Sequence, residues 1–322
     1  PDGEDWRVPV GELESRITEL SNNLVEAGIE AALIQSPVDL YYYAGGRQNG
    51  ALLIPAVDSE ASTEQGGDGA TFFVRRSVER AKFEAGADDS CLEIQKFPSL
   101  RIFAETLTNM GIDGGIGLQL GEIPADFGQK FKNALAPLGE GKDCTAIVHH
   151  QRETKSDWEL EMMRKGTKVQ RQMFEAVKQS VTLGATELDL VAAAEEVSRR
   201  HGFGGTVQMR RFPLQCDRAV IASGRAGGVP SFFDSAIGGT GPHPMAGMGS
   251  GFTKLEENQP ILVDLVHAHR GYVVDATRMF SIGGLSERWL ERLSDMVEVS
   301  DSVVASLGRG DDCSKAWQIG SE

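Results

Sequence analysis

The sequence predicts an α/β (α+β) fold in two domains. Over the first 150 residues, short apolar runs typical of buried strands alternate with segments of helical periodicity. A polar stretch at 149–159 lacks apolar periodicity and separates this region from a second set of elements. A chain of 322 residues is also long enough for two domains. We therefore expect domains at 1–152 and 153–322.

The first domain is predicted from helix and strand patterns that follow one another along the chain. A helix at 12–27 places four leucine or isoleucine side chains at helical spacing and stops at Gly28. A second helix is expected at 100–111. Strands are expected at 31–35, 50–56, 71–76 and 114–120, and 61–70 reads as a polar, glycine-rich turn.

The second domain begins with two helices that carry their own start signals. Ser156 and Glu159 form a capping box, and Thr186 with Asp189 forms the next one. A strand at 218–223, a glycine-rich loop at 238–251 and a hairpin at 261–280 follow. A last helix is expected at 286–307.

Composition excludes some classes of function. The net charge of −15 opposes binding to nucleic acid. No run of 18 apolar residues is present, so we expect no membrane partner, and the N-terminus lacks the pattern of a signal peptide. The four cysteines are far apart and form no CxxC pair, which favours free thiols in a reducing, cytoplasmic compartment.

The hairpin holds the main chemical signal, because Asp264 and Asp275 each interrupt an apolar run. Burial of an unpaired carboxylate is costly, and neighbouring carboxylates repel each other. A two-residue loop of His269 and Arg270 would place Asp264 directly opposite Asp275, and a bulge at Gly271 would shift the pairing by one residue. A bound cation would offset the repulsion. Alternatively, each aspartate pairs with a buried arginine or caps a backbone amide.

Three motifs resemble those of one known family. The hairpin pattern "VDL" and "DATRMF" places its two aspartates eleven residues apart. Upstream, "ETKSDWELEMMRKG" (153–166) and "GIEAALIQSPVDLYYYAGG" (28–46) occur in the matching order. Together these segments resemble the creatinase/prolidase/methionine aminopeptidase family, the pita-bread metallopeptidases. The resemblance implies a creatinase-type N-terminal domain followed by a pita-bread catalytic domain.

The resemblance also implies a site and an activity. It implies two divalent metal ions (Mn, Co or Zn) held by two Asp, one His and two Glu, with Asp264 on one ion and Asp275 bridging both. Thr277 would orient Asp275, and His243 would contact the substrate and stabilise the transition state. The implied activity is a metal-dependent exopeptidase that removes an N-terminal residue before proline, as an Xaa-Pro aminopeptidase or dipeptidase. A homodimer is implied as well.

The chain departs from the family pattern after the hairpin. Only 47 residues follow Asp275, and none of them is histidine. Glu287 and Glu291 lie on the polar side of a predicted helix, where a solvated face explains them. We therefore expect a catalytic domain that is incomplete in this chain, with the remaining His and Glu ligands beyond Glu322 or on another polypeptide. The alternatives are a metal-free, creatinase-like amide or amidine hydrolase and a ligand-deficient binding scaffold.

Other histidines and glycines carry weaker signals. Strand alternation turns His267 away from the Asp264 face, and we interpret His267 and His269 as residues of the turn. His149 and His150 are expected to be exposed in the linker. The "GMGSG" segment (247–251) resembles a phosphate-binding loop, but no helix follows it, which disfavours a dinucleotide site.

Overall fold

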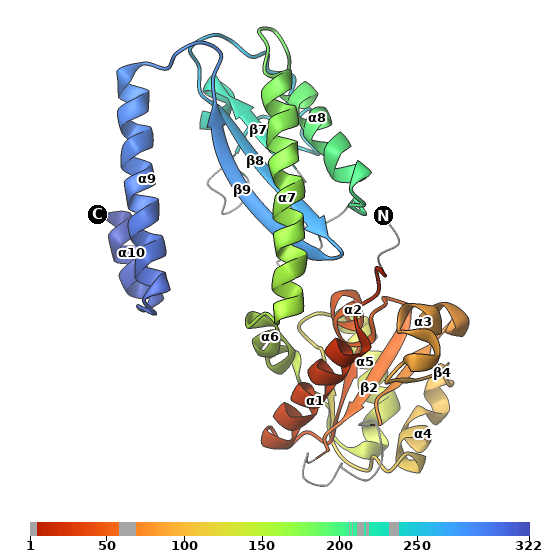
Figure 1. Ribbon diagram of the computed structural model, residues 1–322. Helices are drawn as coiled ribbons and strands as arrows, with labels where there is room; N and C mark the ends of the chain where they lie inside the picture. The colour runs from red at the N-terminus through yellow and green to blue at the C-terminus, as the bar shows by residue number, and fades with distance from the viewer. Residues whose placement is uncertain are drawn as a thin grey trace. The chain divides into compact units, whose positions relative to one another are not determined.

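The computed structural model describes residues 5–57, 69–205, 207, 209–210, 216, 219–231 and 238–322. It divides into two compact units, residues 1–160 and 161–322, which are described separately (Figure 1). The domain boundary that we propose, between residues 152 and 153, falls at the end of helix α6 (Thr145–Glu153). Most of the predicted turn at 61–70 lies outside the described residues.

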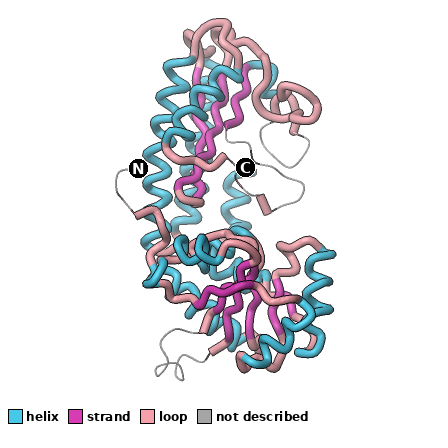
Figure 2. Tube along the Cα trace, turned by 90° about the vertical axis from the view of Figure 1, so that its right-hand side faces the viewer, coloured by secondary structure: helices cyan, strands magenta, loops and turns pink. Residues whose placement is uncertain are grey.

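The first unit is built on a mixed six-stranded sheet in the order β4-β3-β2-β1-β5-β6 (Figure 2). Strand β2 is antiparallel to both of its neighbours, whereas the outer pairs β3–β4, β1–β5 and β5–β6 are parallel. The strands are β1 (Ala31–Ile34), β2 (Gly50–Pro55), β3 (Thr71–Val74), β4 (Glu93–Lys96), β5 (Ile116–Leu118) and β6 (Lys142–Asp143).

Helices cover both faces of this sheet, as the alternation along β1 shows. Ala32 and Ile34 belong to one apolar cluster, together with side chains of α1, while Ala31 and Leu33 belong to a second cluster with side chains of α4 and α5. Successive strand residues point to opposite faces, so β1 is buried on both. The helices are α1 (Val10–Glu26), α2 (Pro37–Ala44), α3 (Val78–Glu84), α4 (Phe103–Asn109), α5 (Ala125–Leu135) and α6, with short 3-10 turns at Ala87–Asp89, Leu100–Ile102 and Ala136–Leu138.

The polar stretch at 149–159 is not a linker. Its first residues complete α6, and α7 begins at Asp157. His149, expected to be exposed, is half-buried, and its Nε2 lies 2.8 Å from Oε1 of Glu122. His150 is exposed as expected. Polarity misled the prediction because one side of α6 faces solvent while Val148 and Gln151 are buried.

The second unit starts with two capped helices. Helix α7 (Asp157–Ser180) begins at the predicted capping box, where the Ser156 amide donates to Glu159 and the Glu159 amide donates to the Ser156 hydroxyl. Helix α8 (Glu187–Arg200) begins at Thr186, whose hydroxyl accepts from the Asp189 amide. Both start signals are confirmed. They could be predicted from sequence because a capping box is a contact between residues three apart.

A three-stranded antiparallel sheet in the order β7-β8-β9 completes the core of this unit. Its strands are β7 (Ala219–Ser223), β8 (Ile261–His269) and β9 (Tyr272–Phe280), and a 3-10 turn at Gly224–Gly228 follows β7. Ile261, Val263 and Leu265 point to the side of the sheet that packs on α7 and α8. Buried Gln170 of α7 donates its side-chain amide to the Leu265 carbonyl at 2.6 Å.

Two further helices follow the sheet, α9 (Glu287–Gly308), as predicted, and α10 (Cys313–Ser321), which was not. They pack on each other, and many of their apolar side chains are exposed, including Trp289, Leu290 and Met296 on α9 and Trp317 on α10. Across the part of the chain that the structure describes, no helix has the length and apolar character needed to cross a membrane.

Candidate metal-binding hairpin and its surroundings

The β8–β9 hairpin turns at Arg270 and Gly271, one residue later than predicted. Both have positive φ, 49° and 88°, as the two central residues of a type I′ turn require. Glycine accepts this conformation without cost, which places Gly271 inside the turn rather than after it. The register therefore pairs Asp264 with Thr277 and Val266 with Asp275. The predicted direct pairing of Asp264 with Asp275 is wrong.

The two aspartates are nevertheless neighbours. Asp264 and Asp275 lie on the same face of the sheet, one step apart along the diagonal, and diagonal partners lie about 7–8 Å apart between backbones, within reach of each other's side chains. Burial first, and then the charge of Asp264 and a hydrogen bond to it, raise the pKa of Asp275 to about 6. The pair is therefore a site of concentrated negative charge.

The expected burial of both aspartates is wrong. By solvent accessibility Asp264 is half-buried and Asp275 is exposed, although the surrounding protein atoms still partly desolvate the Asp275 carboxyl. Their face of the sheet points away from the core formed with α7 and α8, since the neighbouring residues Val263 and Leu265 fill that core. In β8 the buried residues include Ile261, Val263 and Leu265 on the core face, whereas no residue of β9 is buried, so the aspartates occupy the more open face.

Thr277 contacts the pair, but its partner differs from the prediction. Its hydroxyl donates to Oδ1 of Asp264 at 2.6 Å, not to Asp275. The difference follows from the register. A turn that lies one residue later moves every pairing partner by two residues, so Thr277 instead of Asp275 lies directly opposite Asp264. Thr277 therefore orients the carboxylate of Asp264.

His243 lies at the tip of the glycine-rich loop (238–251) and is exposed. The loop doubles back on itself: the Gly241 amide donates to the Gly249 carbonyl, and the Ala246 amide donates to His243. A Cβ placed at Gly249 would lie 3.5 Å from Val220, and Val220 is the register partner of Asp264. The base of the loop thus rests on the sheet beside the aspartate face.

His267 points away from the aspartates, as strand alternation predicted, but it is not a turn residue. It is a fully buried residue of β8, and its Nδ1 lies 2.8 Å from the hydroxyl of Ser198 on α8. The Phe203 ring packs against it. Burial first, and then the charges of His269 and His201, lower the pKa of His267 to about 4. His267 is therefore neutral at physiological pH.

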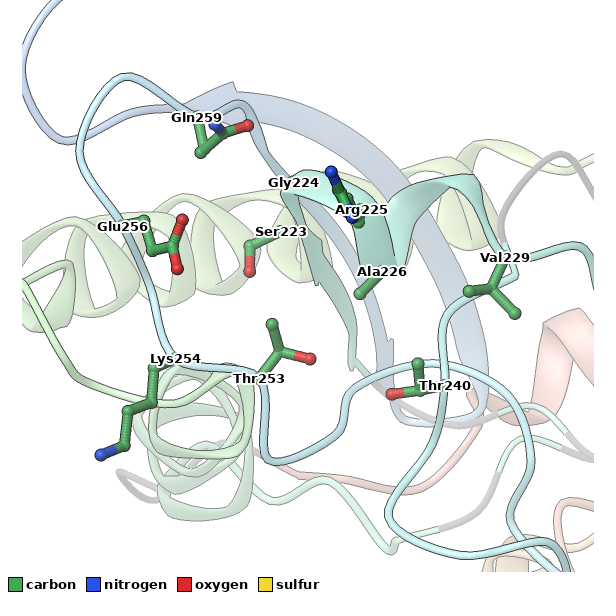
Figure 3. Close-up of a pocket in the computed structure, with 10 residues that line it drawn as sticks. All are labelled: Ser223, Gly224, Arg225, Ala226, Val229, Thr240, Thr253, Lys254, Glu256 and Gln259. Atoms are coloured by element: carbon green, nitrogen blue, oxygen red, sulfur yellow. The ribbon is translucent and has the colours of Figure 1, made fainter.

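A pocket of about 690 Å³ lies at the end of β7 (Figure 3). Hydroxyl groups of Ser223, Thr240 and Thr253 contribute to its lining, and Arg225, Lys254 and Glu256 bring charges to it. Thr240 belongs to the glycine loop, and Thr253 lies two residues after its end. The loop therefore borders both the pocket and the strand opposite Asp264.

The sequence interpretation missed Glu187, a buried residue that is hydrogen-bonded to the pocket residue Ser223. Its carboxylate accepts from the Ser223 amide at 2.7 Å and from the Gly251 amide at 2.8 Å. Burial raises the pKa of this carboxyl, and the hydrogen bonds from Gly251 and Ser223 oppose the shift. A glutamate at the first helical position also favours the helix dipole, so its sequence context gave no reason to expect burial.

The donor set of the aspartate face suits a hard or borderline divalent cation. Two adjacent carboxylates without a cation repel each other, and this repulsion adds to the burial that raises the pKa of Asp275. A bound cation would reverse the sign of that interaction. Within the described ranges, no group of three or more His, Cys, Asp or Glu side chains forms a metal cluster. The pair thus supplies two of the five metal ligands that the family resemblance implies.

Comparison with known proteins assigns each half of the chain. Residues 16–154 match the model of the creatinase/prolidase N-terminal domain, and residues 161–319 match that of metallopeptidase family M24. The Xaa-Pro dipeptidase of Pyrococcus furiosus is 23% identical over 301 residues, a match that covers 92% of this chain and 73% of that protein.

Solved structures show the same fold. The prolidase from Pyrococcus horikoshii OT3 has a TM-score of 0.68 at 19% identity, covering 90% of this chain and 71% of that structure. An Xaa-Pro dipeptidase from Bacillus anthracis has a TM-score of 0.70 at 18% identity, covering 89% of this chain and 70% of that structure. The predicted fold class is confirmed. The chain belongs to the pita-bread hydrolases of metallopeptidase family M24 and carries a creatinase-type N-terminal domain.

Proposed function

We propose that the protein is a metal-dependent exopeptidase that releases an N-terminal residue preceding proline, acting on dipeptides or longer peptides as a homodimer in the cytoplasm. The observation that carries the proposal is the pair Asp264 and Asp275, side by side on the open face of the hairpin. The similarity to Xaa-Pro dipeptidases supports the substrate class.

The residues of this chain would divide the work as follows. Asp264 and Asp275 would hold two divalent ions (Mn, Co or Zn), and when bound these supply an activated water and a Lewis acid. Thr277 fixes the orientation of Asp264 through its hydroxyl. His243 would stabilise the negative charge that develops on the oxygen of the scissile carbonyl.

The direct test uses protein expressed from the complete gene, stripped with chelator and reloaded with Mn²⁺, Co²⁺ or Zn²⁺. We expect release of the first residue from Xaa-Pro peptides and no release from matched Xaa-Ala peptides. Chelation should abolish the activity and reloading should restore it. Light scattering on the same sample should give the mass of a dimer. No release from Xaa-Pro peptides under any metal would refute the proposal.

A binding scaffold is the second candidate, and one observation favours it. Across the described residues no third metal-ligating side chain joins Asp264 and Asp275. A scaffold would bind no metal in stoichiometric amount and would hydrolyse neither peptide series. The metal-free hydrolase is disfavoured, because a site that works without metal gains nothing from two adjacent carboxylates, which repel each other.

Replacing Thr277 by valine is expected to weaken divalent metal binding about 10–100-fold, because the hydrogen bond that orients the Asp264 carboxylate is lost. Titration calorimetry with Mn²⁺ measures the change. Thr277→Ser is the matched control, since it keeps the hydroxyl and should bind metal like the wild type. Equal affinity in the valine and serine variants would contradict the assigned role of Thr277.

A further inference from the structure

Glu187 is a buried carboxylate that joins three separate segments of the second unit. It is the first residue of α8 and is fully buried. Its Oε1 accepts from the amide and the hydroxyl of Ser223, at 2.7 and 3.2 Å, at the end of β7. Its Oε2 accepts from the Gly251 amide at 2.8 Å, at the end of the glycine loop. One carboxylate thus uses both oxygens on two segments distant in sequence.

The backbone of Glu187 strengthens the same junction. Its amide donates to the Thr253 carbonyl at 3.1 Å, and two residues earlier the Ala185 carbonyl accepts from the Leu255 amide at 2.8 Å. The backbone at the start of α8 therefore holds the segment that follows the glycine loop, and the Glu187 side chain holds Gly251 at the end of the loop itself. Ser250 adds one contact to β7, where its hydroxyl accepts from the Ile221 amide at 2.7 Å.

The glycine loop is compact enough for an anchored base to determine the position of its tip. At Gly239 and Gly241, which have φ of 88° and 60°, a Cβ would lie 2.3 Å from the Gly249 carbonyl oxygen and 1.7 Å from that of Ala246. The two legs of the loop therefore pack backbone against backbone. We therefore expect displacement of Gly251 to displace His243 as well.

The residues that Glu187 holds also border the pocket of Figure 3. Ser223 lines it directly, and Gly251 lies between the two lining residues Thr240 and Thr253. A Cβ at Gly251 would lie 2.6 Å from the Thr240 hydroxyl, which places the two sides of the pocket wall in contact. Glu187 is hydrogen-bonded to Ser223 and to Gly251, and so holds β7 and the loop together.

From these contacts we infer that Glu187 is a positioning residue: it fixes the glycine loop and the adjoining pocket wall against β7, and thereby sets the position of His243. The catalytic role of His243 rests on the proposed function. The anchoring of the loop by Glu187 does not. The anchoring requires a carboxylate, because only a group with two acceptor oxygens satisfies donors on both segments.

The test replaces Glu187 by glutamine in the full chain. The amide group of glutamine leaves one acceptor oxygen, so its nitrogen faces a backbone N–H and one segment loses its anchor. Hydrogen exchange should accelerate about tenfold or more at the loop amides of Gly241, Ala246 and Gly249, while amides of β8 and α7 keep wild-type rates. In the active enzyme, kcat should fall with little change in Tm.

Glu196→Gln is the matched control, because it removes an exposed carboxylate from the same helix and should leave loop exchange unchanged. If Glu187→Gln does not fold, Glu187→Asp carries the test: its shorter side chain reaches one segment only, and loop exchange should still accelerate. Unchanged loop exchange overturns the inference, as does acceleration throughout β7, β8 and β9.

The exchange experiment needs neither metal nor substrate, which separates it from the proposed function. If His243→Ala leaves peptidase activity intact while Glu187→Gln still loosens the loop, the catalytic role of His243 fails and the anchoring by Glu187 stands. If the loop is unaffected but activity on Xaa-Pro peptides is present, the anchoring fails and the proposed function stands.

Discussion

Replacing Asp275 by asparagine is expected to lower kcat/KM for Xaa-Pro peptides by about 1,000-fold or more in the metal-loaded protein. The variant keeps the size of the side chain but removes one negative charge from the metal-binding face, and Lewis-acid stabilisation of a transition state is worth several kcal/mol. Steady-state kinetics and metal analysis of the same sample measure both losses. Wild-type kinetics with a full complement of metal would contradict the assignment.

In the metal-free protein the same substitution is expected to maintain or increase the stability of the fold. Without a cation, burial and the neighbouring Asp264 raise the pKa of Asp275. Loss of its charge therefore removes a repulsion. Chemical denaturation at pH 7 should show Asp275→Asn at least as stable as the wild type. Asp295→Asn on the exposed surface of α9 is the control and should change neither stability nor metal binding.

Acidification below pH 6.5 is expected to destabilise the second unit through His267. The pKa of this buried imidazole is lowered from 6.5 to about 4, so the unfolded state binds its proton more readily. Stability is therefore fully present above pH 6.5 and declines as the pH falls towards 4. Over this window the loss of stability amounts to about 3.5 kcal/mol at most, at about 1.4 kcal/mol per pH unit.

Urea denaturation between pH 4 and 7 measures this effect, with His267→Gln as the comparison. Glutamine can bond to Ser198 but does not titrate, so the variant should show a shallower dependence on pH than the wild type. The difference between the two proteins isolates His267 from the carboxylates that titrate in the same range. Parallel curves for both proteins would show that His267 contributes nothing to acid sensitivity.

Features set by local contacts were predictable from the sequence. The capping boxes at Ser156 and Thr186 and the leucine spacing of α1 involve residues three or four apart, and all three helices begin close to the expected residue. Strand alternation likewise correctly predicted that His267 lies on the opposite face of the sheet from Asp264. In each case the deciding interaction lies within one helical turn or one strand.

The register of the hairpin and the exposure of its aspartates were not predictable in the same way. Register depends on which two residues take positive φ, and the choice between His269–Arg270 and Arg270–Gly271 shifts every pair by two. Exposure of Asp275 depends on what lies against the outer face, which alternation alone does not reveal. The apolar runs around both aspartates suggested burial of the carboxylates, whereas only the opposite face of the strands packs against α7 and α8.

The role of Glu187 could not be predicted because its partners are distant in sequence. Gly251 lies 64 residues away, and Ser223 lies 36 residues away. Its neighbours Thr186 and Asp189 form a capping box that explains the whole segment as a helix start. A glutamate in the first turn of a helix is ordinarily solvated, so nothing distinguished this one before the strand and the loop were placed.

The position of Asp275 in the middle of β9 has a consequence for association between molecules. Among the described residues, β9 pairs with β8 alone and leaves its other edge without a strand partner. Open edges invite pairing with strands of other molecules, and a charged side chain within such a strand opposes it. Within the described residues, the carboxylate proposed to bind metal therefore also opposes pairing of another molecule's strand with this edge of β9.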